Sequence, residues 1–210
     1  MNFFSDEKKN ALLKKINSIE FSVKINENLT LFYTDFFALT PEHYLTDKLI
    51  NAFTAKLLQK KKKKHFFFDT MFMYTWEEEK ELGGIDPKSW THLFVDYEKV
   101  FIPILNYKKT HWVLVVVDMM SRTIVYYDSA LTKKNKSGEK YLKLTKDFLD
   151  KVSKESVIFQ TMTYEKTPQQ NNIYDCGVYV CAIMKCICEN KEFKFSPDDM
   201  RYHMMELFLE

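Results

Sequence analysis

The hydrophobic pattern predicts four strands in the middle of the chain. Residues 111–119, HWVLVVVDM, form a nearly continuous apolar run, which is typical of a strand buried on both faces. A second strand is predicted over 123–129, TIVYYDS, and the short MMSR link between the two runs indicates an antiparallel hairpin. The apolar, β-branched run 100–105 and the run 156–162, SVIFQTM, predict two further strands.

Helical patterns predict helices before, between and after these strands along the chain. The expected helices are 5–17, 40–59, a short one within 86–95, 141–155, 176–190 and 196–210. Ser5 and Ser196 are candidate caps, Thr40-Pro41 reads as a helix start with Asp47 as a second possible cap, and 176–190 is apolar nearly all round, as in a buried helix.

No internal repeat and no long linker interrupts the 210 residues, so the sequence predicts one α+β domain. Within it we expect residues 1–39 to form an N-terminal extension packed on a core of residues 40–210. The aromatic stretch 29–39 has no clear period and predicts a strand or a packed loop, and 132–140 predicts a polar surface loop.

Charge and composition limit the binding partners and cellular locations that we expect. The net charge of +2 provides no global attraction to nucleic acid or to an anionic membrane. No apolar run reaches 18 residues, so we expect no membrane partner. The N-terminus lacks a signal-peptide layout, so we expect an intracellular protein, in the nucleus or cytoplasm or in a host cytosol if it is a secreted effector. Nothing in the sequence requires a dimer, and we expect a monomer. The lysine run Lys60–Lys64 is compatible with a nuclear localisation signal or a nucleic-acid-binding patch. We favour the interpretation that it is a solvated loop or helix end, where lysines suit the negative end of the helix dipole.

The cysteines lie within 13 positions near the C-terminus: Cys176, Cys181, Cys186 and Cys188. A disulfide framework would spread its cysteines along the chain, and no Cys-x-x-Cys zinc spacing occurs. We therefore expect reduced thiols, no metal site and no cofactor.

Cys176 stands apart from the other three because it follows a polar loop and opens the predicted buried helix. The positive end of the helix dipole favours a thiolate there, and Gly177 permits a close approach of another chain. His111 starts the apolar strand and Asp128 ends the neighbouring one, so a hairpin would bring the carboxylate to the imidazole, as in a cysteine-protease triad. Gln170, six residues before Cys176, is a candidate oxyanion donor. Taken singly, each of these polar residues also suits a purely structural role.

Four sequence blocks resemble the ubiquitin-like-protein protease family, whose best-known members are the SUMO- or sentrin-specific cysteine proteases. They are HYLTDKLIN (43–51), KVFIPILNYKKTHWVLVVVD (99–118), TIVYYDSA (123–130) and PQQNNIYDCGVYVC (168–181). The resemblance covers about residues 40 to 205. It implies a papain-like or adenain-like α+β fold, with a central mixed sheet flanked by helices and the nucleophile at the N-terminus of a buried helix.

The resemblance also implies roles for individual residues. His111 would be the base, Asp128 its orienting acid, Cys176 the nucleophile and Gln170 the oxyanion donor. The acyl group would be the C-terminal diglycine of a ubiquitin-like modifier, lying between Trp112 and Tyr44 and reaching Cys176-Gly177, while Asp47 would face a basic residue of the modifier.

This sequence departs from the family pattern near the site. Tyr44 replaces a tryptophan, Ile173 stands where a glycine is usual, and Ala130-Leu131 replace glycines. These changes leave the choice of modifier open. A SUMO isopeptidase or precursor protease is the leading hypothesis, and ubiquitin or a Nedd-type modifier is the alternative substrate. An acetyltransferase of the same superfamily, an inactive modifier-binding module and a DNA-activated viral-type protease remain as other classes.

Overall fold

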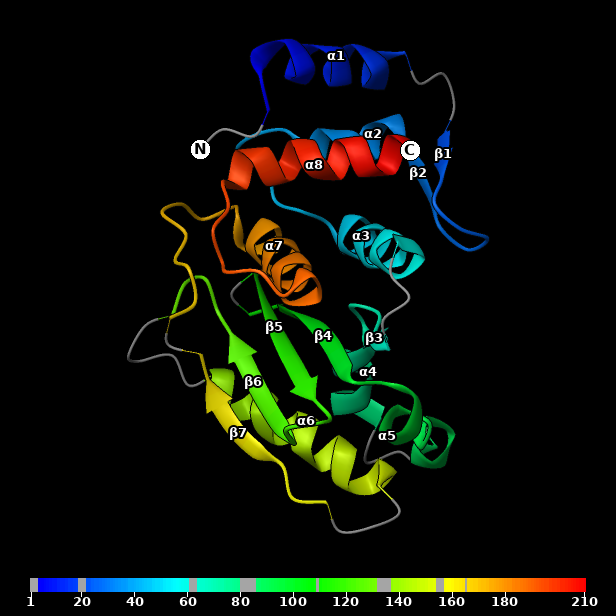
Figure 1. Ribbon diagram of the computed structural model, residues 1–210, viewed down its shortest axis with the longest axis vertical. Helices are drawn as coiled ribbons and strands as arrows, with labels where there is room; N and C mark the ends of the chain where they lie inside the picture. Colours follow the sequence, from blue (N-terminus) through cyan, green and yellow to red (C-terminus); the bar gives the residue numbers. More distant parts are fainter. Residues whose placement is uncertain are drawn as a thin grey trace. The chain divides into compact units, whose positions relative to one another are not determined.

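Two structural units, each built from its own elements, make up the chain in the computed structural model (Figure 1). One comprises residues 1–62 and 170–210, and the other residues 63–169. The structure describes residues 4–18, 22–60, 64–79, 86–108, 110–131, 137–153, 157–164 and 166–210. Most of the predicted lysine run and the larger part of the predicted loop at 132–140 lie outside the described residues.

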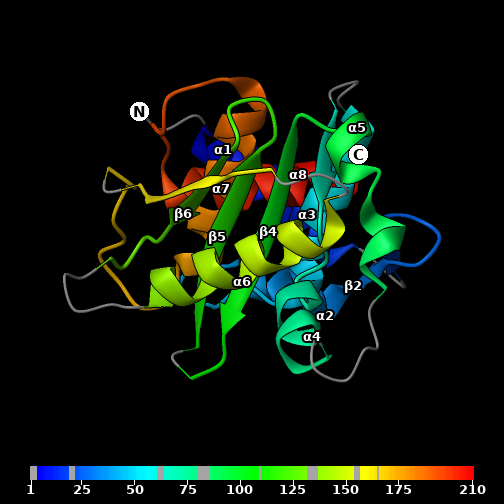
Figure 2. The same cartoon turned by 90° about the horizontal axis from the view of Figure 1, so that it is seen from below.

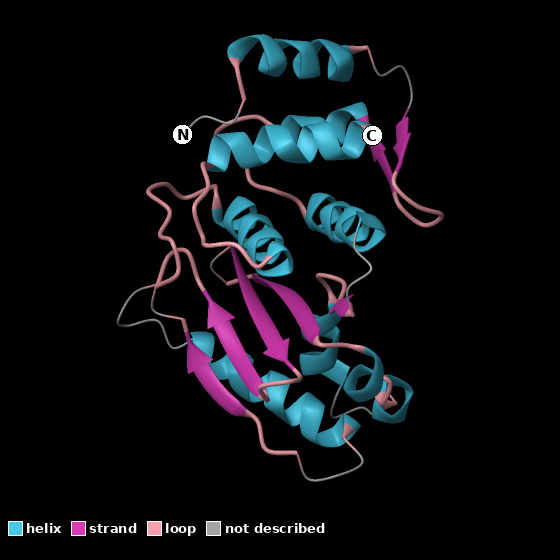
Figure 3. Ribbon diagram, viewed as in Figure 1, coloured by secondary structure: helices cyan, strands magenta, loops and turns pink. Residues whose placement is uncertain are grey.

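The first unit is mainly helical, as the colouring of Figure 3 shows. Its elements are α1 (Asp6–Asn17), β1 (Ser22–Lys24), β2 (Thr30–Phe32), α2 (Tyr33–Phe36), η1 (Phe37–Leu39), α3 (Asp47–Lys60), α7 (Cys176–Glu189) and α8 (Pro197–Leu209). Strands β1 and β2 form an antiparallel pair. The stretch predicted as strand or packed loop therefore divides into a strand followed by two short helical turns.

Two of the predicted helix caps are confirmed. The Ser5 hydroxyl accepts a hydrogen bond from the amide of Lys8 at the start of α1. The Ser196 hydroxyl accepts one from the amide of Asp199, and Pro197 occupies the first turn of α8. Each cap satisfies one of the amides that a helix start leaves without an intrahelical partner.

The predicted start of α3 at Thr40-Pro41 is wrong. Glu42 has a φ of 67°, in the left-handed region, which a continuous right-handed helix excludes. The helix begins at Asp47, and the Thr46 hydroxyl accepts a hydrogen bond from the amide of Leu49. Asp47 thus occupies the first turn instead of capping it.

The second unit contains the main sheet. Its elements are β3 (His65–Phe67), α4 (Phe72–Glu79), η2 (Pro87–Trp90), α5 (Leu93–Asp96), β4 (Lys99–Asn106), β5 (His111–Asp118), β6 (Thr123–Tyr127), α6 (Ser137–Val152) and β7 (Gln160–Thr163). The strand order is β3-β4-β5-β6-β7, with an antiparallel centre and parallel pairing at both edges. The predicted hairpin is β5–β6, and the predicted mixed sheet is confirmed.

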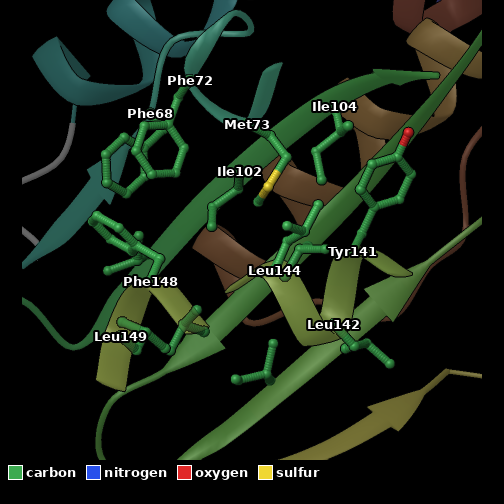
Figure 4. Close-up of a cluster of buried hydrophobic side chains, with 14 of the residues drawn as sticks. Phe68, Phe72, Met73, Ile102, Ile104, Tyr141, Leu142, Leu144, Phe148 and Leu149 are labelled. Carbon is green, nitrogen blue, oxygen red and sulfur yellow. The ribbon is translucent and has the colours of Figure 1, made fainter. Parts of the chain in front are cut away.

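A hydrophobic core covers one face of this sheet. Figure 2 shows α6 running across the strands, and Figure 4 shows its Leu144 and Phe148 among Ile102 and Ile104 of β4. Phe148 lies at the centre of an aromatic cluster with Phe68 and Phe72. The alternation along β5 places Val113, Val115 and Val117 in this core, which fixes the register of the strand that begins at His111.

Some boundaries differ from the prediction. Helix α6 begins at Ser137, four residues before the predicted start. Strand β7, Gln160–Thr163, begins four residues after the start of the strand predicted over 156–162 and ends one residue beyond it. Among the described residues, no helix is long and apolar enough to cross a membrane.

Candidate active site

His111 and Asp128 lie together at one end of the β5–β6 hairpin. His111 is the first residue of β5, and Asp128 directly follows β6. The imidazole Nε2 lies 2.7 Å from the carboxylate Oδ1 of Asp128. The Asp128 side chain is fully buried and that of His111 is 12% exposed. The structure therefore produces the pairing that the hairpin predicted.

Hydrogen-bond donors on both oxygens hold the Asp128 carboxylate, in addition to its burial. The His111 ring and the Ala130 amide contact Oδ1, the amide at 2.8 Å, and the Tyr126 hydroxyl donates to Oδ2 at 2.9 Å. Burial acts to raise the pKa of Asp128, but the hydrogen bond with His111, the bond from the Ala130 amide, the attraction to His111 and the bond from Tyr126 together lower it below its usual value. An ionised carboxylate is the form that orients and stabilises an imidazolium.

Sequence reasoning missed two residues that support this acid. Tyr126 lies two positions before Asp128, and strand alternation places it on the same face, so a period-2 pattern was the available signal. Gln169 donates from Nε2 to the backbone oxygen of Asp128 at 3.0 Å, and its Oε1 accepts from the amide of Leu131 at 2.9 Å. Gln169 thereby fixes the turn that contains Asp128. The sequence pattern had indicated only the adjacent Gln170, as a candidate oxyanion donor near Cys176.

Cys176 is the first residue of α7 in the helical unit, where the sequence predicted it. Cys176 and Gly177 are both buried, and Asp175 occupies the cap position with φ −87° and ψ 0°. The helix N-terminus places partial positive charge near the thiol. Of the four cysteines, all of which the structure describes, none forms a disulfide. Burial raises the pKa of the Cys181 and Cys186 thiols, as expected of structural cysteines.

Asn172 shapes the loop that leads to Cys176. Its Oδ1 accepts from the amides of Tyr174 and Asp175 at 3.1 and 3.0 Å, and its Nδ2 donates to Oδ2 of Asp175 at 2.8 Å. The Gln170 side-chain amide donates to the backbone oxygen of Asn172 at 2.7 Å. The predicted oxyanion donor is therefore held within the loop that precedes α7.

Arg201 of α8 is a buried charge that the sequence analysis did not identify. Its guanidinium donates to Oδ1 of Asp175 from Nε at 3.2 Å and from Nη2 at 2.6 Å. It also donates to the backbone oxygens of Ala38, Thr40 and His43 at 3.0, 3.1 and 2.7 Å. Arg201 thus ties the residue before Cys176 to the segment that precedes Tyr44. A single arginine in an amphipathic helix carries no sequence signal for this role.

The remaining candidate residues have contrasting exposure. Trp112 is buried in β5, whereas Tyr44 is 42% exposed and Asp47 is exposed at the start of α3. Within the residues that the structure describes, no group of His, Cys, Asp and Glu has the arrangement needed to hold a metal ion.

The α+β fold, with its mixed five-stranded sheet, is of the papain-like or adenain-like cysteine-protease type. The chain matches the family model "Ulp1 protease family, C-terminal catalytic domain" over residues 25–210. The chain therefore belongs to the Ulp1 protease family. The resemblance inferred from the four sequence blocks is confirmed.

Particular relatives agree with this assignment. The chain is 29% identical over 181 residues to ubiquitin-like-specific protease 1 of Saccharomyces cerevisiae, covering 84% of this chain and 28% of that protein. It is 29% identical over 182 residues to human sentrin-specific protease 5, covering 82% of this chain and 24% of that protein. The chain thus spans about a quarter of the length of these relatives.

Solved structures support the fold class. The C-terminal Ulp1 protease domain, solved in complex with Smt3, the yeast orthologue of SUMO, aligns with a TM-score of 0.83 at 25% identity. The alignment covers 98% of this chain and 95% of that one. The predicted α+β protease fold is confirmed.

Proposed function

We propose that this chain is a cysteine isopeptidase that cleaves after the C-terminal diglycine of a ubiquitin-like modifier, with SUMO as the first candidate. Family membership supports the class of reaction, and the pairing of His111 with Asp128 at 2.7 Å is the observation that carries the mechanism. The Ulp1 domain solved with the yeast SUMO orthologue supports the choice of modifier. In this proposal Cys176 and the His111–Asp128 pair act together in the active protein.

The proposed reaction begins at the thiol. Because Asp128 binds Nε2 of His111, the other ring nitrogen, Nδ1, is assigned to take the proton of Cys176. The sulfur then attacks the carbonyl carbon of the terminal glycine, and the bond to the lysine Nζ of the target breaks. The leaving amine takes the proton from His111, and water hydrolyses the thioester to release the modifier and restore the thiol.

The developing oxyanion requires donors beside the nucleophile. We assign this role to the Gln170 side-chain amide and the backbone N–H of Cys176. The hydrogen bond from Gln170 to Asn172 supports a fixed orientation of the Gln170 amide, which avoids reorganisation during the reaction.

Trp112 and Tyr44 are the proposed walls of a narrow channel for the diglycine tail, which ends at Cys176 and Gly177. Glycines have no side chains, so a narrow aromatic channel admits them and excludes larger residues. Asp47 is the proposed contact for a basic residue of the modifier, and its exposure at the start of α3 suits that role. The departures at Tyr44, Ile173 and Ala130-Leu131 are expected to adjust how the tail fits.

Cleavage of defined conjugates tests the proposed reaction. SUMO, ubiquitin and a Nedd-type modifier, each joined through an isopeptide bond to the same lysine peptide and each also supplied as a precursor, are incubated with the protein. We expect the SUMO substrates to be cleaved, Cys176→Ala to abolish cleavage while retaining binding, and the matched variant Cys181→Ala to remain active. Preferential cleavage of ubiquitin or the Nedd-type modifier would change the assigned substrate. Activity that survives Cys176→Ala would refute the mechanism, and cleavage of no substrate by the wild-type protein would favour an acetyltransferase or an inactive binding module.

We further propose that residues 1–210 act as one catalytic domain, as an intracellular monomer without nucleic acid, membrane or cofactor requirements. The modest net charge supports the expectation about nucleic acid. Sedimentation of the purified chain with and without a DNA duplex tests both the monomer and the absence of nucleic-acid binding.

A further inference from the structure

The two oxygens of the Asp128 carboxylate have separate partners. Oδ1 accepts hydrogen bonds from the His111 ring and the Ala130 amide, whereas Oδ2 accepts one from the Tyr126 hydroxyl at 2.9 Å. The Tyr126 side chain is buried, so this hydrogen bond is shielded from competing water.

We propose that Tyr126 is a positioning residue for the reaction, because its hydroxyl locks the Asp128 carboxylate in the orientation that serves His111. This inference rests on the proposed function. A carboxylate held on one oxygen only can rotate about its bond to Cβ, which changes the direction and length of the contact with Nε2. With a donor on each oxygen, that rotation breaks at least one hydrogen bond.

The register of β6 explains why Tyr126 reaches Asp128. Ile124 and Tyr126 both lie in the core that α6 covers, and alternation places Asp128 on the same side. A buried tyrosine hydroxyl requires a partner, and the carboxylate two residues further along the strand provides one.

The protonation state of Tyr126 favours its role as donor to Asp128. Burial raises the pKa of Tyr126, and the neighbouring negative charge of Asp128 raises it further, so the phenol remains a proton donor across the working pH range. The ionisable groups that face the Tyr126–Asp128 pair are His111 from β5 and Tyr141 from α6. Tyr126 is also one of the groups that lower the pKa of Asp128 against the effect of burial.

Gly138, in the first turn of α6, fixes the ring that carries this hydroxyl. A Cβ atom added at Gly138 would lie 2.9 Å from Cδ1 and 3.0 Å from Cε1 of Tyr126. The missing side chain therefore allows the helix to pack directly on the ring. Any larger residue at this position must displace the ring or the helix.

The test compares Tyr126→Phe with Tyr127→Phe. Both changes remove one phenolic oxygen from adjacent positions, but strand alternation directs Tyr127 to the other face, where its ring packs against Tyr164. With the cleavable modifier conjugate as substrate, we expect Tyr126→Phe to lower kcat about tenfold at unchanged KM and to move the acidic limb of the pH–rate profile to higher pH. Tyr127→Phe should keep both the rate and the profile of the wild-type protein. Gly138→Ala keeps the hydroxyl but crowds the Tyr126 ring, so it should change kcat and the profile in the same direction as Tyr126→Phe.

A second readout does not depend on the substrate. The titration of the Asp128 carboxyl carbon, followed by NMR, should shift to higher pH in Tyr126→Phe and stay unchanged in Tyr127→Phe. An unshifted titration, or an active wild-type enzyme whose kcat is insensitive to Tyr126→Phe, would overturn the proposal and leave the proposed function intact. A wild-type protein that cleaves no conjugate would instead count against the proposed function, and the titration would still decide the role of Tyr126.

Discussion

Replacement of Arg201 by methionine tests how much the buried ion pair of Arg201 and Asp175 stabilises the helical unit. Arg201 is 1% exposed and donates five hydrogen bonds, two to Oδ1 of Asp175 and three to the backbone oxygens of Ala38, Thr40 and His43. Methionine fills a similar volume but satisfies none of these acceptors. The Asp175 carboxylate would then be a buried charge without its guanidinium partner.

The expected loss in the free energy of unfolding follows from this geometry. Removal of one partner of a buried ion pair costs about 3–5 kcal/mol, since an uncompensated charge remains. For a chain of this size, that loss corresponds to a decrease in Tm of about 6–20 °C. The ion pair of exposed Lys8 and half-buried Glu206, 2.8 Å apart, provides a control, and Lys8→Met should cost at most about 1 kcal/mol.

Urea denaturation followed by two probes measures this loss. The three tryptophans, Trp76, Trp90 and Trp112, all lie in residues 63–169, so their fluorescence reports on the sheet unit, whereas far-UV circular dichroism also reports on the helices around Arg201. If the chain folds as one domain, both probes give coincident transitions that shift together in Arg201→Met.

A double-mutant cycle then isolates the ion pair. Asp175→Asn in the Arg201→Met background should cost less than it costs alone. In that background it removes the unpaired carboxylate, whereas alone it leaves the buried Arg201 guanidinium without its charged partner. A destabilisation by Arg201→Met below about 1 kcal/mol, or strict additivity in the cycle, would refute the reasoning.

Three further predictions concern the core, the acid and metals. Phe148→Ala should lower the free energy of unfolding by about 3–5 kcal/mol in urea titrations, because the ring is buried among Phe68, Phe72 and Trp76; a loss below about 1 kcal/mol would contradict this. The pKa of Asp128 is lowered in the folded protein, so its contribution to stability is complete above the unfolded value of about 3.9 and disappears as the pH falls through the folded value. Asp128→Asn should therefore show a shallower loss of stability on acidification than the wild-type protein, and parallel acid titrations would count against the assignment. Cleavage should persist in EDTA, and loss of activity that added metal restores would contradict a thiol mechanism without metal.

The parts of the fold that the sequence predicted well have strong local patterns. The continuous apolar run of β5 leaves few alternatives to a buried strand, and the short link after it dictates a hairpin. That hairpin alone brings His111 to Asp128. The cap and proline at the start of α8 likewise act within one turn of the helix.

The parts that the sequence could not supply depend on contacts between distant segments. Arg201 and Asp175 are 26 positions apart, and no spacing rule connects a helical arginine with a loop aspartate. The start of α3 depends on the left-handed conformation of Glu42, which the helix-start pattern at Thr40-Pro41 does not reveal. Strand β7 is short and mostly exposed, so its apolar signal was too weak to fix its ends.

Capture of the nucleophile by an electrophilic modifier tests the central claim most directly. SUMO with a C-terminal electrophile in place of its terminal carboxylate is incubated with the wild-type protein, and the adduct is located by peptide mass spectrometry. The account predicts one covalent SUMO adduct, on Cys176, that forms much more slowly in His111→Asn and is absent from Cys181, Cys186 and Cys188. An adduct on one of those three cysteines, or equal capture in His111→Asn, would contradict it.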